Sequence, residues 1–152
     1  MAIRLNKPSD LITDARLDQN PPDPAKARGT VHVIAGTMTN LADDDSGSTF
    51  LLCQIPANAI LDSNTKFSSA AAGYATIRVG TRASATALLN AAKAAILSPI
   101  VMGDAKHGLP AWQQLGLAAA PDNNMIDLMF TAGANATGAG SMPFEVWYRD
   151  NG

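Results

Sequence analysis

Few side chains in this sequence are of the types that act as nucleophiles or bind metals. The chain contains two histidines, His32 and His107, and one cysteine, Cys53. A zinc site needs further nitrogen or sulfur ligands, and a single cysteine is a poor supply of them. Cys53 lies in an apolar run, residues 50–55, which predicts a buried thiol. We therefore expect no metal site, no internal disulfide and synthesis in a reducing cytoplasm.

The carboxylates are no better arranged for catalysis. Asp43–Asp45 is one acidic cluster, but it lacks the alternating ligands and distal glutamate of a helix-loop-helix calcium site, so it predicts a solvated turn. Glu145 is the sole glutamate, which excludes a hydrolase with paired glutamates. There is no Gly-x-Ser-x-Gly motif, and the glycines of residues 133–140 lack the lysine of a phosphate-binding loop. We expect no enzymatic activity and no cofactor.

Composition limits the partners. The 152 residues are 47% apolar and 16% charged, against about 25% charged in a typical domain. A surface so poor in charge indicates contact with other proteins. A net charge of −2 gives no electrostatic attraction for nucleic acid or anionic lipid, so we expect neither partner. The N-terminal residues lack the apolar core of a signal peptide, and no stretch approaches the roughly 18 apolar residues of a membrane span.

The first 28 residues differ from the rest. They hold 9 of the 24 charged residues and 4 of the 9 prolines. Proline removes backbone donors and keeps the chain extended, so this segment cannot be an interior strand. We interpret residues 1–28 as an extended arm that lies on a partner, with a disordered leader as the alternative, and residues 29–152 as one folded domain.

After Gly29 the pattern is mainly β. Short segments with alternating or continuous apolar residues are separated by turn residues, which is typical of an antiparallel sandwich or barrel. The expected strands are residues 30–38, 49–55, 59–67, 74–80, 125–131 and 144–148.

Two segments suggest helix. Ser84–Leu97 is rich in alanine with apolar residues at helical spacing, which predicts an amphipathic helix that stops before Pro99. Residues 110–116 begin with proline and end with glycine, which predicts a short helical turn. The glycine-rich residues 132–140 are expected to form a flexible hairpin loop between the last two strands.

Three apolar side chains are candidate partner contacts. In the last strand Phe144 and Val146 should point one way and Trp147 the other. The indole is therefore either covered within the molecule or exposed as an interface anchor. Met125 and Met129 flank another strand, where they either fill gaps in the core or offer apolar contacts to a partner.

Several runs resemble one protein family. These are Arg28–Val33, Leu41–Phe50 and Gln54–Leu61, followed by Leu109–Leu117, Pro121-Asp122 and the strand at 125–131. In this order they are similar to small virion proteins of tailed phages that decorate, or cement, the head. The matching runs span about residues 28–148. The alanine-rich segment after Gly80 departs from the family pattern, which leaves strand count and topology open.

The resemblance implies a jelly-roll-like β-sandwich bound outside a shell of major capsid protein. On this hypothesis the chain is a non-enzymatic virion protein on the capsid exterior, a homo-oligomer with a trimer favoured. Arg4, Lys7, Asp10 and Arg16 of the arm would clamp a neighbouring subunit, and Trp147 or the two methionines would lie at an interface. The alternatives are a neck or tail ring, a head fibre, or a carbohydrate-binding jelly-roll module.

Overall fold

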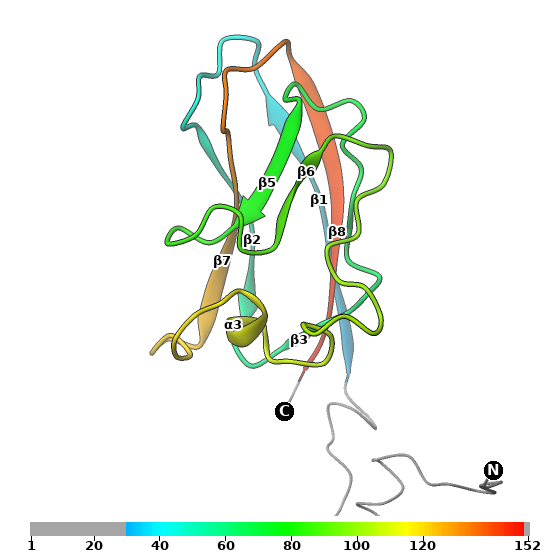
Figure 1. The fold of residues 1–152 in the computed structure, drawn as a ribbon, viewed down its shortest axis with the longest axis vertical. Coiled ribbons are helices and arrows are strands. Elements are labelled where there is room, and N and C mark those ends of the chain that lie inside the picture. Colours follow the sequence, from blue (N-terminus) through cyan, green and yellow to red (C-terminus); the bar gives the residue numbers. More distant parts are fainter. Residues whose placement is uncertain (1–29, 151–152) are drawn as a thin grey trace, which may run out of the picture.

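Most strands alternate apolar and polar side chains, so two sheets can pack with their apolar faces together. The computed structural model describes residues 30–150 (Figure 1). The predicted arm, with its four candidate contacts Arg4, Lys7, Asp10 and Arg16, lies outside the described residues. Within them the chain is a sandwich of two antiparallel sheets with one short helix. This confirms the mainly β fold class.

The first sheet, sheet A, is built around the long C-terminal strand. β1 (Val31–Asn40) pairs with β8 (Gly140–Arg149) over ten residue pairs, from Val31 opposite Arg149 to Asn40 opposite Gly140. On the other side of β8 lie β3 (Ile60–Leu61) and β4 (Lys66–Phe67). The strand expected at 59–67 is therefore two short strands separated by a turn. β1 is an edge of this sheet.

The second sheet, sheet B, has the order β2-β7-β5-β6. Its strands are β2 (Thr49–Pro56), β7 (Met125–Thr131), β5 (Thr76–Gly80) and β6 (Leu89–Ala92). A register shift between Leu51 and Cys53 marks a bulge in β2. β2 and β6 are the edges of this sheet.

The pairing order is that of a jelly roll. The first strand pairs with the last and the second with the next to last, as β1–β8 and β2–β7 show. Leu97 completes the pattern next to β4, because its backbone exchanges hydrogen bonds of 2.8 and 2.9 Å with Phe67 of that strand. This single bridge takes the place of a full edge strand in sheet A.

The core lies between the sheets. Ile77 and Val79 of β5 face Val146 of β8, and all three are fully buried. An aromatic group adds to this layer: the ring of Tyr74 lies 5.1 Å from that of Phe130. The inward orientation predicted for Phe144 and Val146 of β8 is confirmed.

The alanine-rich helix predicted over Ser84–Leu97 is wrong. This segment contains β6, which pairs with β5 from Val79 opposite Leu89 to Thr76 opposite Ala92, with loops on either side. Leu88 enters the core, whereas Ile96, expected on the same helical face, is 57% exposed. Helix propensity is a local and weak preference, and here the hydrogen bonds along the edge of sheet B and burial of Leu88 outweigh it.

The short helix predicted within residues 110–116 forms, but the hairpin predicted at residues 132–140 does not. The short helix is confirmed as α3 (Ala111–Gln114), which follows Pro110 and ends before Gly116 at a φ of +73°. Leu115 is buried against the core at 2% exposure. The loop at 132–140 is not a hairpin, because it carries the chain from β7 in sheet B to β8 in sheet A.

Candidate interaction surface

The outer face of sheet A presents the one tryptophan singled out from the sequence. Trp147 points away from the core, while its neighbour Val146 is fully buried, so the predicted orientation is confirmed. Its indole is partly exposed, and its Nε1 donates a hydrogen bond of 3.1 Å to Oε2 of Glu145. Opposite it on β1 stands Val33, 46% exposed. The indole is thus partly covered within the domain and partly exposed.

The backbone of Trp147 is held by a buried hydroxyl. The Oγ1 of Thr65 accepts a hydrogen bond from the Trp147 N–H at 3.1 Å and donates one to the Trp147 carbonyl oxygen at 3.0 Å. Thr65 is fully buried in the turn between β3 and β4. The indole therefore projects from a fixed stretch of backbone, which lowers the entropy lost when a partner binds.

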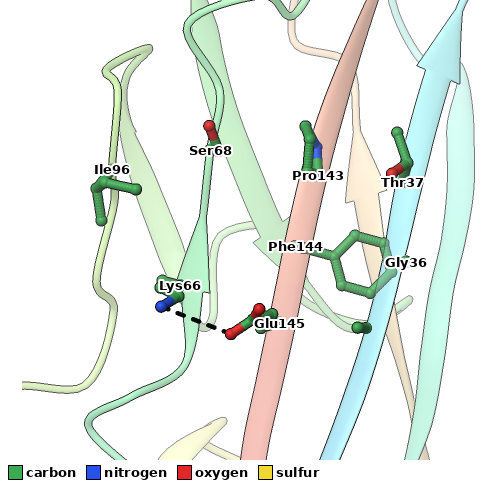
Figure 2. Close-up of a pocket in the computed structure, with 9 residues that line it drawn as sticks. Gly36, Thr37, Lys66, Ser68, Ile96, Pro143, Phe144 and Glu145 are labelled. Carbon is green, nitrogen blue, oxygen red and sulfur yellow. Dashed lines mark ion pairs between the residues drawn. The ribbon is translucent and has the colours of Figure 1, made fainter.

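A groove of about 410 Å³ runs along the same face (Figure 2). Pro143 and Glu145 of β8 lie between Thr37 on β1 and Lys66 on β4, and Ile96 stands beyond β4. The Lys66 Nζ lies 3.5 Å from Oε2 of Glu145. The groove thus combines apolar walls with one exposed ion pair.

Electrostatics keep Glu145 ionised. The hydrogen bond from Trp147 lowers the pKa of Glu145 most, the neighbouring Lys66 lowers it further, and partial desolvation opposes them. An ionised carboxylate and a lysine offer a partner one charge of each sign. Such exposed charges contribute mainly to the orientation and rate of binding.

The open edges of the two sheets lie on the same side of the sandwich. β1 and β2 contain no charged residue, and a groove of about 350 Å³ between them is lined by residues 36–39, residues 50–52 and Phe144. Natural edge strands are usually protected by charges, prolines or bulges. β2 has a bulge and ends in Pro56. The ten residues of β1 include no proline, no bulge and no aspartate, glutamate, lysine or arginine. Among residues 30–150 no strand pairs with the outer edge of β1, so its backbone groups can pair with an extended segment of another chain.

The two methionine candidates are separated from Trp147. Met125 begins β7 in the other sheet and is 37% exposed. Met129 lies on the outward side of the same strand but is only 6% exposed, so it has little surface to offer a partner. The structure corrects the expectation for Met129 and does not bring Met125 and Trp147 together.

Exposed apolar residues outside the regular strands escaped the sequence analysis. Val101 and Met102 are 56% and 75% exposed in the long loop before α3, and Leu41 is 63% exposed after β1. The one signal in the sequence is an apolar run that continues past Pro99 up to Gly103. Val101 and Met102 thus add an exposed apolar patch to that loop.

The acidic, histidine and cysteine side chains considered in the sequence analysis have structural roles. The Oδ2 of Asp44 accepts a hydrogen bond of 2.7 Å from the Leu41 N–H, which makes the acidic cluster a turn. The ring of His32 stacks on Tyr148 at 5.1 Å. Burial raises the pKa of the Cys53 thiol to about 12, so it is protonated and unreactive at neutral pH. Residues 30–150 contain no cluster of three metal-binding side chains and no helix able to cross a membrane.

Comparison with known proteins gives one likeness of fold. No family model matches the chain, and neither does any curated protein sequence. Among solved structures, a chain from the cyanophage Pam1 capsid asymmetric unit matches with a TM-score of 0.52 and 18% identity. The match covers 97% of this chain and 93% of that one. At this identity the two chains share a fold.

Proposed function

We propose that this chain is a structural protein of a tailed-phage head and, more narrowly, a decoration protein on the outside of the shell. The observation that carries the proposal is the likeness of fold to a chain of a phage capsid, over nearly all of both chains. The coverage also means that the two chains are similar in length. A small sandwich is thus already known as a component of one such capsid.

The surface of the described domain supports a role in binding protein. The uncharged edge at β1, the groove beside Glu145 and the fixed indole of Trp147 are features of interfaces. Val33 and Leu51, at 46% and 56% exposure, extend the apolar area toward the open edges. These features suit contact with other copies and with the major capsid protein better than a free monomer.

The mechanism would be multivalent binding. A symmetric oligomer, which we expect to be a trimer, joins several shell subunits through one rigid body, so it dissociates only when all contacts open together. A ligand that binds the assembled lattice and not its free subunits stabilises the lattice by mass action. The arm, residues 1–28, would clamp a neighbouring subunit through Arg4, Lys7, Asp10 and Arg16, whose charges set the register.

Reconstitution on heads that lack this protein tests the proposal. The full chain should bind the outer surface to saturation and raise the temperature at which the heads rupture. A variant without residues 1–24 should keep the circular dichroism spectrum of the full chain and lose binding. Failure of the full chain to bind contradicts the decoration role, whereas binding of the truncated chain at full occupancy contradicts the clamp alone.

The main rival is another virion component, such as a neck or tail ring or a head fibre. The same likeness of fold would fit it. The number of copies per particle separates the two, because a decoration protein follows the lattice of the shell and a ring occupies one axis.

A further inference from the structure

Figure 1 shows the loops that join β1 to β2 and β7 to β8 at the end of the sandwich opposite the C-terminus. Residues of the loop from β7 to β8 line a separate cavity together with the start of β5. Its volume is about 300 Å³. β5 and the two residues before it form one wall of the cavity, and the loop after β7 forms the other. The residues that line it are Tyr74, Ala75, Thr76, Arg78, Gly133, Ala134, Asn135 and Thr137.

Arg78 supplies the charge of this cavity. It lies on the outer face of sheet B, because its neighbours Ile77 and Val79 are fully buried. Within residues 30–150 its guanidinium has no hydrogen bond and no ion pair. The side chain is nevertheless confined: a Cβ at Gly133 would come within 2.6 Å of its Nη1. The guanidinium thus lies directly against the loop at Gly133, and a side chain there would displace it.

Asn135 supplies a second donor on the facing loop. Its Oδ1 accepts a hydrogen bond of 2.8 Å from the Ser46 N–H, which fixes the amide and leaves Nδ2 without an acceptor in the described part of the chain. Thr137 is anchored as well, since its Oγ1 donates to the Gly73 carbonyl oxygen at 3.1 Å. The buried Tyr74 hydroxyl also has no hydrogen-bond partner, so three residues that line the cavity carry a donor without an acceptor in residues 30–150.

The charges around the cavity leave it open to an anion. No carboxylate lines it. Burial raises the pKa of Tyr74, and the nearby carboxylates of Asp44 and Asp45 raise it further. The Leu41 N–H holds the Asp44 carboxylate in its own turn, and neither aspartate lines the cavity, whereas Arg78 does. Lys93, whose Nζ donates to the Ala72 carbonyl oxygen at 3.4 Å, adds a positive charge close by.

We propose that this cavity binds a small oxyanion, a carboxylate or a phosphate group, between the Arg78 guanidinium and the Asn135 amide. The planar, paired N–H groups of arginine match the two oxygens of such a group, and a charge-assisted pair is stronger than a neutral one. The volume is at the lower end for small-molecule sites, which suits a ligand no larger than a monosaccharide. The proposal is independent of the role in the virion.

Nuclear magnetic resonance titration of the full chain tests it. Inorganic phosphate, acetate and glucuronate are added separately at constant ionic strength, with glucose as the neutral control. We expect saturable shifts of the Arg78 Nε–H and the Asn135 side-chain amide with at least one of the anions. The order of affinities then tells phosphate from carboxylate and from an acidic sugar. Shifts that never saturate, or equal saturation by glucose, overturn the proposal.

Two arginine variants make the test specific. Arg78→Gln should weaken anion binding about tenfold or more, the loss expected for a charge-assisted pair. Arg82→Gln is the matched control, because Arg82 is exposed just after the same strand and does not line the cavity. Both variants should keep the dispersed spectrum of the folded chain. If both weaken binding equally, the anion responds to general charge and the site is refuted.

Discussion

Trp147 is positioned by hydrogen bonds rather than by burial. The Thr65 hydroxyl fixes its backbone and Glu145 accepts from its indole, so the ring is already oriented when a partner arrives. Large aromatic side chains at the centre of an interface carry much of its binding free energy. Trp147→Ala should therefore weaken association with capsid or other copies by about 2 kcal/mol or more. Binding isotherms and sedimentation velocity measure this.

Leu41→Ala is the control for that variant. Leu41 is 63% exposed, and it lies beyond the opposite end of β1 from Val33, the cross-strand partner of Trp147. We expect it to leave association unchanged. Loss of unfolding free energy in Trp147→Ala with association intact would show that the indole serves only to cover its own domain.

One buried amide, that of Asn40, joins the loops at the end of the sandwich opposite the C-terminus. Asn40 is completely buried; its Nδ2 donates to the carbonyl oxygens of Leu41 and Gly138, and its Oδ1 accepts from the Gly73 N–H at 3.0 Å. One side chain thus joins the end of β1 to two distant loops. This explains how glycine-rich loops at that end of the sandwich hold a defined shape.

At the scale of elements, the approach of β5 to the following loop depends on one glycine. A Cβ at Gly80 would overlap the carbonyl oxygen of Ser84 and the backbone nitrogen of Ala87, which are rigid groups. Gly80→Ala should therefore lower the unfolding free energy by about 1–3 kcal/mol, the usual cost of overpacking. Urea denaturation measures the change.

Gly138 offers the matched control. A Cβ there would meet nothing within 4 Å, and its backbone conformation is not left-handed. Gly138→Ala should change stability by no more than about 0.5 kcal/mol, as is usual for surface positions. Equal losses in the two variants would contradict the close packing of the β5–β6 loop.

The same region marks the limit of sequence analysis. The strands at β5, β7 and β8 could be predicted because each has an apolar face whose period of two is visible locally. The edge strand β6 could not, since its state depends on hydrogen bonds with β5. For the interaction surface, alternation gave the orientation of Trp147, but the exposed edge at β1 could be recognised only once the sheet order was known.

On the scale of the whole molecule, the proposed anion site and the chain ends of the described domain lie at opposite ends of the sandwich. The described chain begins and ends at one end, where Val31 pairs with Arg149, and the Arg78 cavity lies near the other (Figure 1). Residues 1–28 therefore join the described domain at the end opposite the proposed anion site.

The most direct test of the virion role is the amount of this chain in purified particles. Quantitative mass spectrometry of the phage that encodes it should find the chain in a fixed ratio to the major capsid protein, at a number set by the lattice of the shell. Electron microscopy of the same particles should place it outside the head. Absence from the particles, or a copy number that fits one ring at the neck or tail, would contradict the assignment as a decoration protein.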